Sequence, residues 1–519
     1  MAEPMITNTL HGRRVIYTVE EKITRENVLT VLNEALTWHL RNLEEIETLY
    51  WYRRGVCPIL GRKKEIRPEI NNKVVVNLAD RIVTFKNGYF LTDPVSYIAR
   101  RGKEEVADKV SEYNEYVYQS GKQIADNRIV DWFHTVGVGA LYVEPNKGPD
   151  KDTRPVLTNA VDPRSAFVVY SLRPGNKPVM GVNTVVYGDT AWFDVFTEDY
   201  VFRCKGASTG QTVTMEVPVA LTAMTVESVE RNVVGMIPII EYQYNGQRFG
   251  AFENVIQLLD AINILKSDQT NGVELAVQQL CVAWNCQFEE GTTANSIRQS
   301  GMLVLRSFGD QKADFKIMDS TLDQTATQRN IDDLYTQVLE IAGVPSSNRT
   351  ATSTSDNVGA VYLRAGWAAA DTACRNTEDL FRESNRRFDE VFLRILKAQK
   401  GFDLNASDFE VVFKRNSVDN ILVKTQAAIN MKNLGFAPEI ALSRSGLSSD
   451  PITDIEVSKK YMDVIWNPML MLNNTENPEV QTPGEQVGTE PKSRGDEPQE
   501  ATDNPRGEGS GHWVRGYWR

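Results

Sequence analysis

Apolar residues recur along the chain at two different spacings, and these divide it into helical and β-rich stretches. Near the N-terminus they recur every three or four positions, a spacing typical of helices that pack one face against a core. Thr24 stands where it can cap the first of these helices. That helix is predicted to begin near Glu26, and the next ones are 74–90, 104–119 and 123–136.

After residue 139 the pattern changes to short runs rich in Val, Tyr and Phe, separated by Gly, Pro and Asn. Such runs predict β-strands joined by turns. The predicted strands are 140–143, 166–170, 182–187, 192–196, 200–204, 212–217 and 237–242. With the preceding helices they predict an α+β domain that extends to residue 250. One more predicted strand, 408–414, comes late in the sequence and is a candidate to rejoin this domain.

From residue 251 helical spacing returns and surrounds a small β-containing insert. The predicted helices are 251–280, 326–343 and 358–400. The last, if unbroken, would be about 65 Å long at a rise of 1.5 Å per residue. The insert contains predicted strands at 282–288, 302–305 and 315–318.

A polar loop, residues 346–357, separates the second of these helices from the third. Its sequence, SSNRTATSTSDN, consists almost entirely of hydroxyl and amide side chains, with one charge of each sign. Gly343 and Pro345 end the preceding helix, since proline cannot continue the helical hydrogen bonds. A flexible linker is the simplest interpretation. The position between two helices, deep inside the chain, favours a functional loop instead.

The C-terminal part combines short helices with a tail of different composition. Helical spacing predicts helices at 421–433, 438–445 and 454–466. Beyond residue 467 the chain is rich in Pro, Gly, Glu, Asn and Thr and poor in apolar residues, which predicts disorder. Its last residues, 513–519, are aromatic and basic. They are either a short docking peptide or an incidental feature.

Composition narrows the class of protein. With 519 residues, 41% of them hydrophobic and 24% charged, the chain can form several cores of a soluble globular protein. A net charge of −12 disfavours a protein that grips the phosphates of nucleic acid. Five scattered cysteines favour a reducing compartment. We find no secretion signal and no run of 18 apolar residues, so we expect no membrane span.

Motifs that carry catalysis or bind metals are missing from the sequence. Gly121-Lys122 lacks both the upstream glycine and the following Ser or Thr of a phosphate-binding loop. The four histidines are far apart, and Cys281 and Cys286 have the wrong spacing for a metal knuckle. We therefore predict no catalytic residue, no metal site, no cofactor and no enzyme.

Two charged clusters remain without an assigned role. The segment 50–55, YWYRRG, is compatible with a nucleic-acid patch, but a helix end that packs on a core with solvated arginines is the stronger interpretation. The adjacent carboxylates Asp332-Asp333 and Glu289-Glu290 would point in different directions on a helix or strand. We interpret them as solvated charges.

Several short segments occur in an order that is typical of one family. These segments are YWYRRG at 50–55, INN at 70–72, GYFL at 88–91 with PVSY at 94–97, GMIPIIE at 235–241, LLDAIN at 258–263 with SD at 267–268, GAV at 359–361, and APEIAL at 437–442 with SGL at 445–447 and DP at 450–451. Through them the chain resembles the portal, or head–tail connector, proteins of tailed bacteriophages, of the long-tailed siphophage type. It departs from the family pattern at Thr92-Asp93, where a Gly-Lys pair often precedes the proline, and at the strand 282–286, which is less aliphatic.

The resemblance implies an α+β, multi-domain portal fold. Its parts would be a wing (1–250, with the strand 401–419), a helical stem (251–280 and 326–343), a small β-containing clip (281–325), a tunnel loop (344–357), a long helix (358–400), a helical crown (420–466) and a disordered tail (467–519). Such proteins form a ring, usually of twelve subunits, at one capsid vertex. Double-stranded DNA passes through the ring during packaging and ejection. A polar loop and an acidic protein suit this role, since phosphate contacts would add friction.

The resemblance also implies site residues and partners. The residues that face the DNA channel would be Ser346, Ser347, Asn348, Arg349, Thr350, Thr352, Ser353, Thr354 and Ser355. The clip residues that dock terminase and adaptor would be Trp284, Phe288, Glu289, Glu290 and Arg298.

The implied partners are further copies of the chain in a dodecamer, double-stranded DNA, the terminase large subunit, the major capsid protein, a scaffolding protein and the head–tail adaptor, with no membrane. Assembly would take place in the cytoplasm of a bacterial host and end in the virion. Two alternatives remain: another virion structural protein without a pore, and a ring-shaped nucleic-acid motor component.

Overall fold

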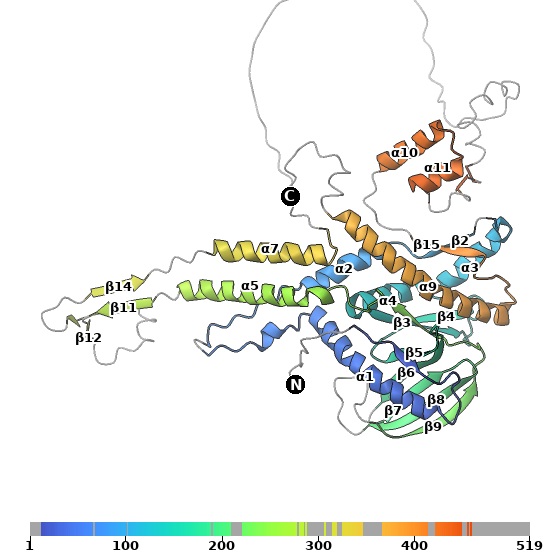
Figure 1. Cartoon of the computed structure of the whole chain (residues 1–519), viewed down its shortest axis with the longest axis horizontal. Coiled ribbons are helices and arrows are strands. Elements are labelled where there is room, and N and C mark those ends of the chain that lie inside the picture. The colour runs from blue at the N-terminus through green and yellow to red at the C-terminus, as the bar shows by residue number, and fades with distance from the viewer. Residues whose placement is uncertain are drawn as a thin grey trace, which may run out of the picture. The chain divides into compact units, whose positions relative to one another are not determined.

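The structure is a computed structural model that describes residues 12–65, 68–100, 102–187, 190–208, 221–277, 280–284, 286–287, 306–307, 314–318, 324–345, 366–413, 421–448, 454–455 and 457–458. Internal contacts divide the chain into two units, 1–454 and 455–519. The elements described below all belong to the first unit. They combine long helices with several sheets (Figure 1), so the predicted α+β class is confirmed.

A six-stranded sheet and the first long helix form one core. The sheet has the order β1-β5-β6-β7-β8-β9, in which β1 runs parallel to β5 and the other pairs are antiparallel. The strands are β1 (Ile16–Thr18), β5 (Ala166–Ser171), β6 (Pro178–Tyr187), β7 (Thr190–Phe196), β8 (Tyr200–Ser208) and β9 (Leu221–Arg231). Helix α1 (Val28–Arg53) buries Val28, Leu32 and Leu36 against this sheet, because a spacing of four puts them on one face.

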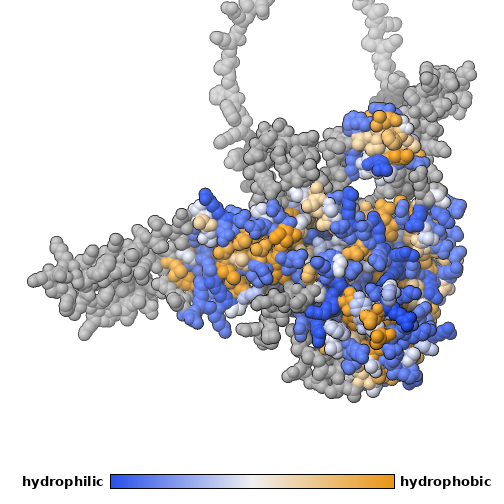
Figure 2. All heavy atoms as spheres, viewed as in Figure 1, coloured by the Kyte–Doolittle hydropathy of each residue, from blue (hydrophilic) through white to orange (hydrophobic). Residues whose placement is uncertain are grey.

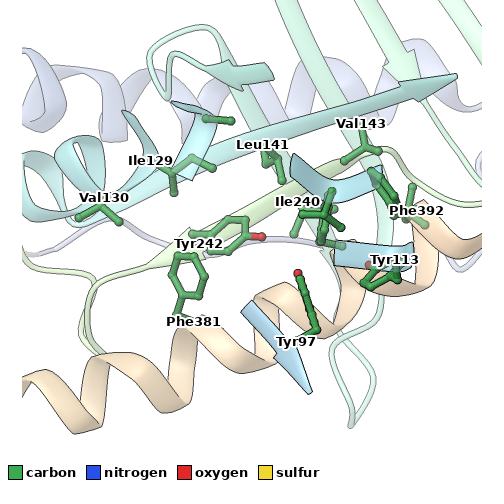
Figure 3. Packing of buried hydrophobic residues seen from close by; sticks show 14 of the residues in the cluster. Tyr97, Tyr113, Ile129, Val130, Leu141, Val143, Ile240, Tyr242, Phe381 and Phe392 are labelled. Carbon is green, nitrogen blue, oxygen red and sulfur yellow. The ribbon is translucent and has the colours of Figure 1, made fainter. Parts of the chain in front are cut away.

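A three-stranded sheet and two helices that pack on the same face of it form a second core. Its order is β10 (Ile239–Gln243), β3 (Val138–Pro145) and β4 (Val156–Val161), all antiparallel. Helices α4 (Lys122–Val136) and α9 (Trp367–Lys400) both pack on it. Figure 3 shows Tyr242 of β10 and Phe381 of α9 facing one another inside this core, with their ring centroids 4.8 Å apart.

The late strand β15 (Phe409–Val412) does return to the N-terminal part of the chain. It pairs in antiparallel register with β2 (Ser96–Ala99), in a two-stranded sheet separate from the larger ones. The short 3-10 turn η2 (Glu104–Val106) and helix α3 (Ala107–Gln119) follow β2, and α3 packs on it. Rings from β2, α3 and β15 meet there, since Tyr97 and Phe409 both contact Tyr113.

A buried polar cluster ties α9 to α3 and α4. Lys122 of α4 forms an ion pair with Asp126 and donates to Asn385 Oδ1 at 3.1 Å. Tyr113 donates its hydroxyl hydrogen to Asp389 Oδ1 at 2.8 Å. These side chains are all buried, and burial raises the pKa of Asp389 to about 7.

A pair of antiparallel helices carries a small set of strands. Helix α5 (Ile256–Val277), which follows the turn η3 (Glu253–Val255), packs along α7 (Thr325–Ile341). Beyond α5, β11 (Leu280–Trp284) pairs with β14 (Asp314–Met318), and β12 (Cys286–Gln287) pairs with β13 (Arg306–Ser307). The described elements also include η1 (Pro58–Gly61), α2 (Leu78–Phe90), α10 (Ile421–Asn433) and α11 (Pro438–Ser445).

Most predicted elements are confirmed, but several helix bounds are wrong. For the predicted ranges 104–119 and 251–280, α3 begins at Ala107 and α5 spans Ile256–Val277. Helix α1 begins at Val28 with Asn27 as its N-cap, and the Asn27 side chain accepts from the Thr24 backbone N–H rather than from the first turn of the helix. Helix α2 begins at Leu78, and 74–77 is extended. Helix α9 begins at Trp367, because Gly366 has a φ of +83°, in the left-handed region that interrupts a helix.

The pattern of the sequence missed β1, β4, β9 and β13. The predicted strands 212–217 and 302–305, and most of the predicted helix 454–466, lie outside the described residues, as does the C-terminal tail. Among the helices that the structure describes, none is both long and apolar enough to cross a membrane.

Candidate functional site

The base of the α5–α7 pair is fixed by a hydrophobic cluster, here called the stem-base core. It includes Val338 and Leu339 of α7, Leu259 and Ile262 of α5, and Leu49 of α1. Residues further along α5 and at the end of α7 are exposed instead, among them Ile264, Leu275 and Ile341. Figure 2 shows the hydrophobic residues that gather over these two helices. The pair therefore has a firm base and an apolar surface that its own chain leaves exposed.

A row of polar side chains on α5 holds the extended segment 70–77 along the helix. Asn263 Oδ1 accepts from the Val76 N–H at 2.8 Å, and Ser267 Oγ accepts from the Val74 N–H at 2.9 Å. One turn further, Asn271 Oδ1 accepts from the Asn72 N–H at 2.7 Å. We call these three side chains the polar ladder.

The polar ladder can bond every second residue of the extended segment because the repeat along the helix matches the repeat along the extended chain. Four residues of a helix rise about 6 Å, close to the advance of two residues in an extended chain. The three ladder side chains are almost completely buried, with exposed fractions of 1%, 0% and 1%. The spacing i, i+4, i+8 of small polar residues in an apolar helix is the signal by which the sequence could have revealed it. In the sequence, the first two of these residues were noticed only as part of a family resemblance.

The predicted channel residues 346–355 lie outside the described residues, but the two ends of that segment are described. Helix α7 ends with Ala342 as its C-cap, and Gly343 follows with a φ of +65°. The chain then enters the buried Val344, which belongs to the stem-base core. Gly343 thus acts as the predicted helix stop.

Of the predicted clip residues, only Trp284 is in a described element. It is the last residue of β11, where it pairs with Asp314 of β14. Phe288, Glu289, Glu290 and Arg298 lie outside the described residues.

The aromatic and basic segment at the end of α1 lines an open cleft, here called the arginine cleft. Its volume is about 840 Å³, and α1, α2, α4 and Arg164 contribute to its walls. The rings of Tyr50 and Trp132 stack at 5.5 Å, and the Arg54 guanidinium lies 4.0 Å from the Tyr50 centroid. Sequence reasoning found the α1 residues of this cleft but could not find the partners from α4.

Carboxylates neutralise only part of the arginine cleft. Arg53 pairs with Asp131 at 2.7 Å and with Asp80 at 3.2 Å. Arg164 pairs with Asp162 at 2.6 Å. The cleft is thus a mixed surface of cations, carboxylates and stacked rings, which is typical of protein interfaces.

The described residues offer no catalytic constellation. They contain no group of three or more His, Cys, Asp and Glu side chains that could hold a metal ion. Cys57, Cys204 and Cys374 are buried and form no disulfide, and burial raises the pKa of Cys57 and of Cys204 to about 11. His134 is buried too, and the pKa of its ring is well below the usual value because of desolvation and the nearby Lys86.

Comparisons with known proteins identify the family. Residues 33–476 match the family described as phage portal protein, SPP1 Gp6-like. No curated protein matches the chain. One similar solved structure is described as "Neck of empty GTA particle computed with C6 symmetry". It is 13% identical, with a TM-score of 0.36, and the match covers 72% of this chain and 90% of that chain.

The family match extends over well more than half of the chain, from the middle of α1 to beyond α11. It decides against the alternatives of a poreless virion protein and a nucleic-acid motor. The chain therefore belongs to the SPP1 Gp6-like family of phage portal proteins, virion components that form, as rings of identical subunits, the DNA-packaging channel at a capsid vertex and that are structural proteins rather than enzymes.

Proposed function

We propose that this protein forms a ring of twelve subunits in which the α5–α7 pair is the stem of the channel. The observation that carries this proposal is the antiparallel pair itself. It is anchored at its base in the stem-base core, bears the β11–β14 strands beyond α5, and leads at the end of α7 into the polar segment 346–357. The same order of parts is expected of a subunit whose stem connects a body to a clip.

The remaining parts follow from this assignment. The α+β body, 1–250 with the late strand, is the wing, 281–325 is the clip, and 420–466 is the crown. Helix α9 is the long helix that crosses the wing, which is supported by its packing on β10 and β3. The DNA passes through the centre of the ring. Terminase and the head–tail adaptor dock at the clip, and the scaffolding and major capsid proteins are the further partners.

Electron microscopy of the purified protein tests the ring. We expect closed rings with an open centre, and class averages with twelvefold symmetry. Exposed apolar residues on the stem need to be covered by neighbouring copies for the protein to remain soluble. A stable monomer at micromolar concentration and physiological salt would contradict the proposal.

A substitution in the segment 346–355 tests whether it lines the channel. Thr350→Lys would place one extra positive charge per subunit around the ring, and lysine makes charge-assisted hydrogen bonds to phosphates that a threonine cannot make. We expect normal rings but incomplete packaging when a portal-deficient phage is complemented with this variant. Thr350→Ser is the matched control and should package full-length DNA. The measurement is the length of DNA protected inside the heads. Full-length packaging by Thr350→Lys would mean that the segment does not line the channel.

A further inference from the structure

The stem-base core separates two charged surfaces that point away from it. On one side, Leu49 and Tyr52 of α1 face the core, while Tyr50, Arg53 and Arg54 face the arginine cleft. On the other side, Val338 and Leu339 of α7 face the core. The solvent-facing surface of α7 is polar and includes the exposed residues Asp332, Asp333 and Gln337.

Two arginines of the arginine cleft have no carboxylate partner among the described residues. Arg54 and Arg128 are exposed and, within the described part of the chain, neither pairs with a carboxylate. Ile124, on the same wall, is 64% exposed. A cleft with two unpaired guanidinium groups, a stacked Tyr–Trp pair and an exposed isoleucine has the residue types that dominate binding energy at protein interfaces. It fits a partner segment that carries carboxylates.

Two carboxylates on the solvent-facing surface of α7 have no basic partner among the described residues. The Asp332 carboxylate accepts only from the Gln328 amide, at 2.7 Å, and the Asp333 carboxylate only from the Gln337 amide, at 2.8 Å, as far as the described residues reach. No lysine or arginine of the described chain pairs with either carboxylate. The two aspartates are consecutive, so their side chains leave the helix about 100° apart, and a cleft that reaches around the exposed side of α7 can contact both.

A ring built by rotation requires two different, complementary surfaces on every subunit. The arginine cleft and the acidic face of α7 are two such surfaces of opposite charge, and the helices that carry them, α1 and α7, both contribute residues to the stem-base core. The cleft also contains Asp80 and Asp131, with side chains 52% and 45% exposed. These carboxylates would repel a phosphate backbone, which makes DNA the poorer occupant.

We propose that the arginine cleft of one subunit binds the acidic face of α7 from the next copy, with Arg54 and Arg128 opposite Asp332 and Asp333. This inference rests on the proposed ring and assigns a surface to it. The contact is head-to-tail, since each copy donates its α7 to one neighbour and receives an α7 from the other. Bidentate pairing of guanidinium and carboxylate fixes the relative orientation of the two copies.

Charge reversal tests the pairing. The cleft variant is Arg54→Glu with Arg128→Glu, and the helix variant is Asp332→Arg with Asp333→Arg. Each variant alone places like charges opposite one another, and we expect half-assembly of rings to need at least about tenfold more protein than the wild type needs. The variant with all four substitutions restores opposite charges and should assemble at nearly wild-type concentrations. Sedimentation velocity and electron microscopy measure assembly.

Mixing gives a second readout that is specific for a head-to-tail contact. In an equimolar mixture of the cleft variant and the helix variant, rings in which the two kinds of subunit alternate have opposite charges at every contact. The glutamate cleft then meets the arginine-bearing helix, and the arginine cleft meets the aspartate-bearing helix. We therefore expect mixed oligomers to form at concentrations where neither variant assembles alone. The effect of each reversal should shrink at about 1 M salt, where the screening length falls to about 3 Å.

Controls separate the possible failures. Arg25→Glu with Arg444→Glu reverses two exposed arginines outside both surfaces and should leave assembly unchanged. Thermal unfolding of each variant checks folding, and Arg54→Gln with Arg128→Gln provides a milder form of the cleft variant. Rings from both reversed variants at wild-type concentrations would overturn the proposed contact, and so would normal rings with lost DNA packaging in the cleft variant alone. A wild-type protein that forms no rings would refute the ring itself.

Discussion

We expect the hydroxyl group of Ser267, the middle residue of the polar ladder, to stabilise the segment 70–77. Ser267 Oγ accepts from the Val74 N–H at 2.9 Å and donates to the Asn263 backbone oxygen at 2.7 Å. Ser267→Ala removes the only side-chain acceptor that the structure gives to this N–H. A buried donor left without a partner costs about 1–3 kcal/mol, and the higher helix propensity of alanine returns about 0.5 kcal/mol. We expect a net loss of about 1–2 kcal/mol.

Hydrogen exchange measures this loss where it occurs. The segment 70–77 should open more often, so its amides should exchange about tenfold faster, since 1.4 kcal/mol corresponds to a factor of ten. Replacement of all three ladder side chains by alanine should cost about 3 kcal/mol, if each bond contributes about 1 kcal/mol, and should raise exchange about a hundredfold. Exchange of the stem-base core should change much less.

Thr270→Ala is the matched control on the same helix. Thr270 is exposed, and its hydroxyl bonds only to the Lys266 backbone oxygen of its own helix, at 2.9 Å. We therefore expect no change in the exchange of 70–77. The reasoning would be refuted if Ser267→Ala left that segment as protected as in the wild type, or if Thr270→Ala exposed it equally.

Three further predictions concern the body and the tail. Asp389 has a pKa of about 7 in the fold against an ordinary 3.8, so the unfolded chain releases this proton first and stability falls as the pH rises from about 4 to about 7. Asp389→Asn should remove this loss of unfolding free energy, which is on the order of 4 kcal/mol at most. Melting curves at pH 5 and pH 8 measure it, and an equal pH dependence in both proteins would contradict the prediction. Gly137→Ala should destabilise the body by about 3 kcal/mol or more, because Gly137 has a φ of +89° and a Cβ there would lie 2.1 Å from the Arg248 backbone oxygen. An unchanged melting temperature would refute this prediction. Truncation after Trp466 should leave ring assembly intact in electron micrographs, because the tail is poor in apolar residues, and loss of rings would show that the tail is structural.

Local pattern was enough for most helices. The predicted range 438–445 matches α11 residue by residue, and the range 326–343 differs from α7 by one residue at its start and two at its end. In both cases the signals lie within the element, namely proline at the start of α11 and glycine after each helix. The family was also within reach of the sequence, because it is read from the order of short segments along the chain.

Tertiary structure decided the conformation of segments whose backbone groups bond to partners far away in the sequence. Residues 74–77 have a helical spacing, yet they are extended, because side chains about 190 positions later in the chain supply acceptors for their N–H groups. The late strand β15 could not be paired from its sequence, since its partner β2 is some 310 residues away. Every non-proline residue has the same backbone N–H and C=O groups, so the sequence does not show which distant residue they will bond to.

The arginine cleft and the buried cluster depended on tertiary structure for the same reason. Tyr50 and Arg54 were visible in the sequence as an aromatic and basic segment, but Trp132, Arg128 and Arg164 join them only in the fold. Asp389 carries no local mark either, and its raised pKa comes from burial among α3, α4 and α9. Sequence alone determined the helical periodicity, the charge balance and the family, because these depend on residue type and order. Which side chains share a surface depends on packing between distant segments, and only the tertiary structure decided that.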